Sequence, residues 1–153
     1  GYREFPITLL PARDGVASGK IRRSAKAPNC SYFTNWISID DKISWDISVA
    51  TTGKYAVEVY YTCAAENVGS SIELTFGEGR SSGQVTEPHD PPARGAENDR
   101  YPRDGESLVK DFRPMTLGEI HLKAGHGPLT LQATRIAGKE VMEVRGIVLK
   151  LVE

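Results

Sequence analysis

The stretch Ile43-Ser-Trp45-Asp-Ile-Ser-Val49, the turn Thr52-Gly53-Lys54 and the stretch Tyr55-Ala-Val-Glu-Val-Tyr-Tyr61 together decide the fold of this chain. In both stretches every second residue is apolar. Such alternation predicts two β-strands that each bury one side and expose the other, separated by a turn. Trp45 lies in phase with the aliphatic residues of its strand, so we expect its indole in the core.

The same alternation recurs further along the chain. Ile72–Phe76 lies between two glycines, Leu129 and Leu131 follow the turn Gly125-His-Gly-Pro128, and Ile147–Leu151 closes the chain. Val141–Val144 begins that last strand or ends the one before it. With 15 Gly and 9 Pro in 153 residues, many short strands and turns are expected. The pattern predicts an all-β domain, either an antiparallel sandwich or a barrel.

Length and charge narrow the class of protein. The 153 residues and 16.7 kDa correspond to a single domain over residues 1–153. With 19 Lys and Arg against 20 Asp and Glu, the net charge of -1 does not favour binding to nucleic acid or to a membrane surface. No apolar run approaches the roughly 18 residues of a membrane span. The chain begins at Gly1 without a signal-peptide pattern, and we interpret it as a domain excised from a larger protein.

Catalytic motifs are absent from the sequence. There is no Gly-x-Ser-x-Gly elbow, no His-Glu-x-x-His and no phosphate-binding glycine loop. His89, His121 and His126 are scattered, which argues against a metal cluster. Cys30 and Cys63 are either joined in a disulfide or are two buried thiols, and both readings remain open. We therefore expect a protein that is not an enzyme.

Two segments interrupt the strand pattern and carry the candidate binding residues. Between Gly15 and Ile39 there is no acidic residue, but Lys20, Arg22, Arg23 and Lys26 are present, and Tyr32, Phe33, Asn35 and Trp36 follow. A sugar ring can stack on an aromatic side chain, and Arg can bind a sulfate or carboxylate with two hydrogen bonds. The alternative is that the aromatic residues enter the core and the basic ones are solvated.

The second interruption is Gly79–Gly105, which we expect to be a long loop. It is rich in proline and in charges of both signs. A loop of this length inside a compact domain is commonly functional or mobile. It forms either a binding rim or a surface loop held by its own ion pairs. The candidate ligand-binding residues in it are Arg94, Asn98, Arg100, Tyr101 and Arg103.

The segment Ile43–Val59 resembles the core hairpin of galactose-binding-like β-sandwiches, in particular carbohydrate-binding modules of families 6 and 35. Ser71-Ile-Glu-Leu-Thr-Phe76 and Val144-Arg-Gly-Ile-Val-Leu149 fit the same strand order. The chain also resembles a C-terminal accessory domain of secreted bacterial sulfatases. That likeness rests on Ala12-Arg-Asp-Gly15, Pro28-Asn-Cys-Ser-Tyr-Phe-Thr-Asn-Trp36, Asp40-Asp-Lys-Ile-Ser-Trp45, Thr86-Glu-Pro-His-Asp-Pro-Pro92 and Arg94-Gly-Ala-Glu-Asn-Asp99.

These resemblances imply an antiparallel β-sandwich of jelly-roll type and a non-catalytic module that binds a polysaccharide or oligosaccharide, neutral or sulfated. Its partner would be a catalytic domain in the same polypeptide, in a secreted or periplasmic enzyme. The sulfatase nucleophile motif Cys-x-Pro-x-Arg is absent. The ligand site of such modules lies before the Trp-bearing strand and before the last strand, which here places Tyr32, Asn35 and Trp36 with Glu143 and Arg145. Many relatives hold a structural calcium near the first strand, where this chain offers Asp14.

Two other functions remain as alternatives. In the first, the chain is a structural domain that packs on its parent enzyme through Tyr32, Phe33 and Trp36 and binds no sugar. In the second, which rests on the fold alone, it is a polysaccharide lyase that uses His89, Arg100 and Tyr101.

Overall fold

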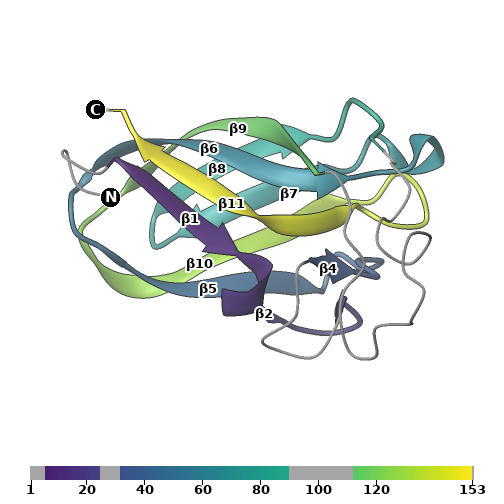
Figure 1. The fold of residues 1–153 in the computed structure, drawn as a ribbon, viewed down its shortest axis with the longest axis horizontal. Coiled ribbons are helices and arrows are strands. Elements are labelled where there is room, and N and C mark those ends of the chain that lie inside the picture. Colours follow the sequence, from purple (N-terminus) through teal and green to yellow (C-terminus); the bar gives the residue numbers. More distant parts are fainter. Residues whose placement is uncertain (1–5, 25–31, 90–111, 153) are drawn as a thin grey trace, which may run out of the picture.

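The protein is a sandwich of two antiparallel β-sheets (Figure 1). The computed structural model describes residues 6–24, 32–89 and 112–152. The first sheet, called sheet A, has the order β3 (Arg22–Arg23), β4 (Phe33–Thr34), β11 (Glu143–Leu151), β6 (Gly53–Thr62) and β9 (Arg113–Leu122), and β1 (Ile7–Pro11) also pairs with β11. Sheet B has the order β2 (Val16–Ala17), β5 (Lys42–Val49), β10 (Gly125–Arg135), β7 (Ser71–Phe76) and β8 (Gly79–Gln84). Two single-turn 3₁₀ helices, η1 (Ala12–Asp14) and η2 (Ala65–Asn67), lie in the connections.

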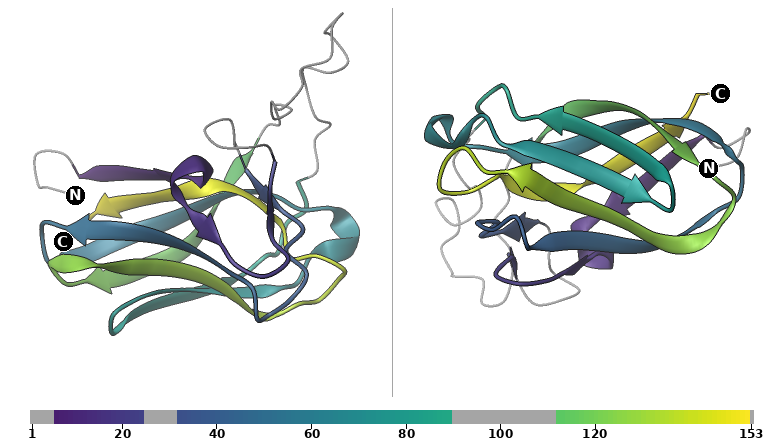
Figure 2. Two further views of the ribbon diagram at one scale, coloured as in Figure 1. Left: turned by 90° about the horizontal axis from the view of Figure 1, so that it is seen from below. Right: turned by 180° about the vertical axis from the view of Figure 1, so that it is seen from behind.

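The alternation in the sequence sets which side of each strand is buried. On β6, the residues Tyr55, Val57 and Val59 are fully buried, and on β5 the residues Ile43 and Trp45 are at most 1% exposed. The two strands predicted from this segment are therefore confirmed. The hairpin implied by the family resemblance is wrong, because the two strands do not pair with each other. They belong to different sheets, so the turn at Thr52–Lys54 crosses from sheet B to sheet A. Their apolar sides face one another across the core, and Figure 2 shows the two layers from below.

Trp45 connects the two sheets. Its indole is 1% exposed, as expected from the sequence, and Nε1 donates a hydrogen bond of 2.9 Å to the carbonyl oxygen of Pro11 at the end of β1. The ring also meets Phe33 edge-on, with 6.4 Å between ring centroids. A strand of sheet B is thereby joined to an edge strand of sheet A by a polar contact as well as by apolar packing.

The predicted strands at Ile72–Phe76, Leu129–Leu131 and Ile147–Leu151 are confirmed as parts of β7, β10 and β11. The expected loop at Gly79–Gly105 is wrong at its beginning, because Gly79–Gln84 forms β8. This strand carries no large apolar side chain. Its buried residue is Ser81, whose hydroxyl donates to the carbonyl oxygen of Leu117, so hydrophobic alternation could not reveal it.

The first prediction concerns Trp45. Trp45→Phe retains an aromatic ring but removes the donor to Pro11, so we expect the free energy of unfolding to fall by about 2 kcal/mol. Urea denaturation followed by fluorescence and circular dichroism measures this change. Val16→Ala, at a residue 66% exposed, is the control and should change stability little. A Trp45→Phe variant as stable as the wild type would show that the contact contributes nothing.

Candidate functional site

The carboxylate of Glu143 ties together three strands at one end of sheet A. Glu143 is the first residue of β11, which lies between β4 and β6. Its Oε2 accepts a hydrogen bond of 2.9 Å from the hydroxyl of Thr34 on β4, and its Oε1 accepts one of 2.8 Å from the hydroxyl of Thr62 on β6. A charged acceptor held by two hydroxyls is fixed in position. The structure therefore places this predicted site residue at a well-defined point.

Glu143 lines a hollow of about 220 Å³. Among the described residues that line it, two are carboxylates and none is Lys or Arg. The amide oxygen of Asn67 accepts the N–H of Lys139 at 2.9 Å, which orients the side chain. Within the described part of the chain, the Asn67 Nδ2 and the half-buried carboxylate of Glu140 have no hydrogen-bond partner. The lining residues are Thr62, Cys63, Ala64, Asn67, Glu140, Met142 and Glu143.

The hollow therefore offers both a donor and an acceptor. Nδ2 of Asn67 can donate, and the carboxylate of Glu140 can accept. A pair of this kind matches the hydroxyl groups of a saccharide, each of which both donates and accepts. Neither residue was singled out in the sequence, because Asn67 follows β6 and Glu140 precedes β11, and only the pairing of those strands brings them together.

Residues 85–89, which follow β8, are hydrogen-bonded to the chain beside this hollow. Cys63 and His89 form a β-bridge, with N–H to carbonyl distances of 2.7 and 2.8 Å. The side chain of Cys63 is buried, and its Sγ lies 3.5 Å from the carbonyl oxygens of Ala64 and Val141. Cys30 lies outside the described residues.

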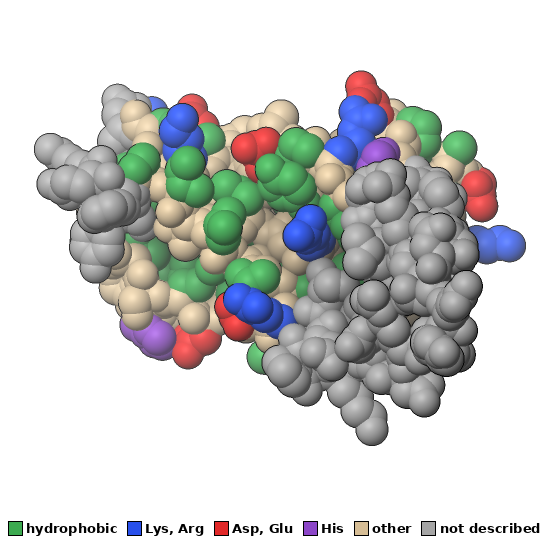
Figure 3. Space-filling view, viewed as in Figure 1, with side chains coloured by type: hydrophobic (Ala, Val, Ile, Leu, Met, Phe, Trp, Pro, Cys, Tyr) green, Lys and Arg blue, Asp and Glu red, His purple; other side chains and the backbone are tan. Residues whose placement is uncertain are grey.

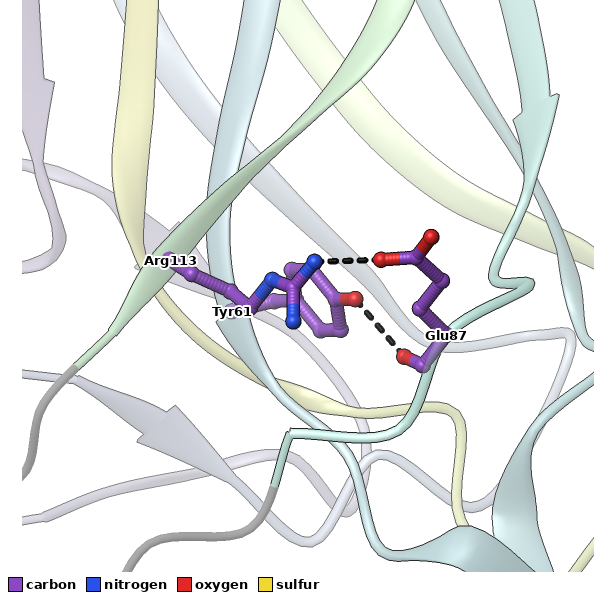
Figure 4. Close-up of polar contacts among 3 residues, drawn as sticks. All are labelled: Tyr61, Glu87 and Arg113. Atoms are coloured by element: carbon purple, nitrogen blue, oxygen red, sulfur yellow. Dashed lines mark hydrogen bonds and ion pairs between the residues drawn. The ribbon is translucent and has the colours of Figure 1, made fainter.

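The same segment is also bound to β6 and β9, because its Glu87 contacts Tyr61 on β6 and Arg113 on β9 (Figure 4). The phenol of Tyr61 donates to the backbone carbonyl of Glu87 at 2.7 Å, and the guanidinium of Arg113 forms an ion pair with the Glu87 carboxylate. Burial raises the pKa of Tyr61 above its usual value of 10.0; Arg113 lowers it, while Glu87 and Cys63 raise it further. The protonated phenol is thus the form that the folded protein favours.

The expected aromatic platform is wrong. Trp36 and Phe33 are each 1% exposed and Tyr32 is 9% exposed, so none of these rings presents a face to solvent. Tyr32 packs against Phe112, with 5.4 Å between centroids, and the backbone carbonyl of Trp36 accepts the N–H of Val141 at 2.8 Å. The segment that ends at position 36 interrupts the alternation, so the sequence does not show which way these rings face. Because the rings are part of the fold, they also cannot form the interdomain patch of the alternative hypothesis.

The two arginines of β3, which belong to the basic residues noted between Gly15 and Ile39, have different environments. The guanidinium of Arg23 donates to the carbonyl oxygens of Ala12 and Gly15 and lies 5.3 Å from the centroid of the Phe33 ring. Its expected role in anion binding is therefore wrong, since its donors serve the turn after β1. Arg22, its neighbour on β3, is exposed.

Asn35 also has a local role. It has a positive φ of 61°, and its Nδ2 donates to the carbonyl oxygen of Lys20 at 2.8 Å. Asparagine tolerates this left-handed conformation better than most residues. Its amide donor is therefore engaged in joining two loops.

Arg145 lies apart from Glu143 although the two are close in sequence. The register between β11 and β6 shifts between Val144 and Gly146, which leaves Arg145 in a β-bulge with an exposed side chain. It borders a second groove, of about 280 Å³, on the outer side of sheet A. Its lining residues are Leu9, Leu10, Pro11, Tyr60, Arg145, Gly146, Ile147 and Val148.

The remaining candidates, Arg94, Asn98, Arg100, Tyr101 and Arg103, lie outside the described residues and stay predictions. In the described ranges, no group of three or more Asp, Glu, His or Cys residues could hold a metal ion. Asp14 is exposed and stands without further acidic ligands there, so we propose no site for the calcium implied by the resemblance. No helix within the described ranges is long and apolar enough to cross a membrane.

Solved structures provide the comparison for this fold. The chain is similar to a GH26-CBM35 β-(1,4)-mannanase of Podospora anserina, with 17% identity and a TM-score of 0.63 over 97% of this chain and 28% of that one. It is similar to the C-terminal CBM6 of the laminarinase LamC from Zobellia galactanivorans, with 13% identity and a TM-score of 0.59 over 94% of this chain and 98% of that one. For the CBM6cm-2 module of Cellvibrio mixtus lichenase 5A, solved with cellotriose, the values are 15% and 0.58, over 97% and 99%.

These likenesses define the fold as the β-sandwich of carbohydrate-binding modules, and they confirm the predicted fold class. The chain spans about a quarter of the mannanase but nearly the whole of the two separate modules. No protein-family model matches the sequence, and no curated protein matches it. The sulfatase resemblance therefore stays a prediction.

The second prediction concerns Tyr61 and pH. Because the pKa of Tyr61 is higher in the folded protein than its unfolded value of 10.0, the stability it contributes is complete below pH 10.0 and is lost as the pH rises through the folded pKa. Tyr55 is also buried with a raised pKa and adds to this loss. Urea denaturation of the wild type and of Tyr61→Phe at a series of alkaline pH values measures it. The variant should lose less stability than the wild type above pH 10.0, and equal slopes would contradict the assignment.

Proposed function

We propose that this chain is a non-catalytic carbohydrate-binding module and that the hollow beside Glu143 is its sugar site. The observation that carries the proposal is the likeness to two separate CBM6 modules along nearly the full length of both chains. An alignment that runs from end to end along two binding domains supports a binding role for the described chain. The hollow supplies the second support, because it is a concave site with donors and acceptors at one end of the sandwich.

Asn67 and Glu140 would bind the sugar hydroxyls, and Glu143 would hold the wall of the hollow in place. The Asn67 side chain is already oriented through its oxygen by Lys139, so little side-chain entropy is lost when Nδ2 binds a ligand. Hydrogen bonds to a charged acceptor contribute about 1.5 to 3 kcal/mol when they are well formed. Two or three such contacts correspond to dissociation constants on the order of 0.1 mM, which is weak binding that a polymeric ligand can strengthen through repeated contacts.

The charge of the hollow favours a neutral saccharide over a sulfated one at this point. Its described lining carries Glu140 and Glu143 and no cation, so a sulfate group would meet like charge. The segment 90–111 carries six acidic and four basic residues in its sequence, so its net charge adds no positive excess. Recognition of a sulfated glycan would instead need the exposed Arg22 and Arg145 together with Arg94, Arg100 and Arg103.

The wider role proposed for the chain is to target an attached enzyme to its polysaccharide. Tethering a catalytic domain to a polymer raises its effective concentration there without new contacts at the active site. The P. anserina mannanase, in which the similar region is 28% of the chain, supports such an arrangement. A parent enzyme that is a sulfatase and an extracellular or periplasmic location belong to the same proposal.

The third prediction tests the site. Asn67→Ala and Glu140→Gln should each weaken saccharide binding about five- to tenfold, since each removes a contact worth about 1 to 1.4 kcal/mol. Glu66→Gln is the matched control, because Glu66 precedes Asn67 in η2, is exposed and does not line the hollow. Binding to a glycan array that holds β-mannan, β-glucan and sulfated galactan oligosaccharides is followed by calorimetry on the ligands that bind.

Each outcome of that test has a defined meaning. Neutral ligands that lose binding in both variants and not in the control support the proposal. Binding that is confined to sulfated ligands, falls with added salt and is unaffected by either variant places the site on the basic residues instead. A chain that binds no glycan on the array contradicts the proposed function.

A further inference from the structure

The edge of β1 carries a feature that sugar binding does not use. β1 pairs with β11 on one side, and no other described strand pairs with it. Its exposed residues are the apolar Ile7 and Leu9, which are 58% and 68% exposed. Hydrophobic side chains gather over the region where β1 and β11 lie (Figure 3). A free, apolar strand edge is a template for pairing with another strand.

The hydrogen-bond pattern shows which backbone groups of β1 face outward. In an antiparallel pair, residues that exchange hydrogen bonds with the partner alternate with residues that do not. The carbonyl oxygen of Pro6 accepts the N–H of Leu151 at 2.9 Å, so in this register Thr8 and Leu10 also bond to β11. The peptide groups of Ile7 and Leu9 consequently point away from β11.

Pro11 confirms this alternation independently. It follows Leu9 by two residues, so its carbonyl oxygen should also point away from β11, and it accepts the indole N–H of Trp45 from sheet B. Ile7 and Leu9 thus combine two properties. They expose large apolar side chains, and in the described part of the chain their outward N–H and C=O groups bond to nothing.

We propose that β1 pairs with β1 of a second copy of this chain, antiparallel and around a twofold axis at Thr8. In that register Ile7 lies opposite Leu9 of the other copy, and the two residues exchange reciprocal hydrogen bonds. Each copy contributes the same groups, as twofold symmetry requires. The two copies of sheet A become one continuous sheet, and the exposed side chains of Ile7 and Leu9 cover one another across the junction.

The charges beside the strand are compatible with this register. Ile7 is opposite Lys150 on β11, and Leu9 is opposite Val148. A row across the dimer therefore runs from Lys150 through Ile7 to Leu9 and Val148 of the other copy, and no like charges face each other. The strand itself, Ile-Thr-Leu-Leu-Pro, has no charged residue of the kind that blocks edge pairing.

The interface is short, so the dimer is weak. A five-residue strand buries less than the roughly 1,000 Å² of a stable complex, and a dissociation constant on the order of 0.1 mM is expected. Association should therefore depend on concentration over an accessible range. This distinguishes twofold pairing from open-ended aggregation, which would not stop at two copies.

Hydrogen exchange measured by NMR on the wild-type chain tests the pairing directly. As the concentration rises from about 0.01 to 1 mM, the exchange of the Ile7 and Leu9 amides should slow, while that of Thr8 and Leu10 should not change, since the latter already bond to β11. Sedimentation velocity over the same range should show the mass rising toward that of a dimer and no further.

Two variants separate backbone pairing from side-chain contact. Leu9→Pro removes an N–H that β11 does not use, and Leu9→Lys places like charges near the twofold axis. Both should weaken dimerisation at least tenfold with circular dichroism unchanged. Val16→Lys, at an apolar residue exposed to the same degree, should not. A chain that stays monomeric at 1 mM, higher oligomers, or unchanged exchange at Ile7 and Leu9 would overturn the proposal whether or not the chain binds sugar.

Discussion

The two-residue alternation of β11 is the constraint on which the rest of the structure depends. This strand has neighbours on both sides, with β6 on one and β1 and β4 on the other. Its buried residues Val144, Ile147 and Leu149 fill the core, and the residues between them face outward. The backbone groups alternate in the same way between β6 and β1. The positions of Glu143 at the end of the sheet and of the outward groups of β1 both follow from this single strand.

The bulge at Arg145 interrupts the alternation at one point and separates two surfaces. Before the bulge, Glu143 joins Thr34 and Thr62 across three strands. After it, Gly146 lets β1 approach closely, since a Cβ there would lie 2.6 Å from the carbonyl oxygen of Leu10. Polar contacts thus dominate one end of the outer face, whereas the part next to β1 is apolar. One strand therefore borders both of the proposed recognition surfaces.

The sequence predicted the strands in which large apolar residues recur at every second position. Ile43–Val49 and Tyr55–Tyr61 are examples, and the burial of Trp45 follows from its phase. β8 was missed because a strand of Gly, Arg, Ser and Gln has no apolar alternation. The extent of β9 was not predicted because its buried Leu117 and Ile120 are three residues apart. The orientation of Trp36 was also wrong, since it depends on the packing of a short segment with no alternation of its own.

Site residues were harder to predict than strands for a related reason. Glu143 was predicted as a site residue from its place before the last strand, a position carried over from a resemblance, and it lines the hollow. Asn67 and Glu140 are more than seventy residues apart and meet only because β6 pairs with β11. The preference for basic residues as ligand contacts failed at Arg23, whose donors are used by backbone carbonyls of the turn after β1. A charge in the sequence does not reveal whether its partner is a ligand or the chain itself.

The two proposals reinforce each other through geometry. Thr8 is opposite Leu149, and Glu143 lies six residues before Leu149 on the same strand, or about 20 Å at the usual rise per residue. Antiparallel pairing of β1 would place the two hollows on opposite sides of the twofold axis, roughly 40 Å apart along the strands. A short oligosaccharide would then occupy one hollow and gain nothing from the dimer. A polysaccharide long enough to reach both would be held by two weak sites, and its affinity would rise through effective concentration rather than through any better contact in either hollow.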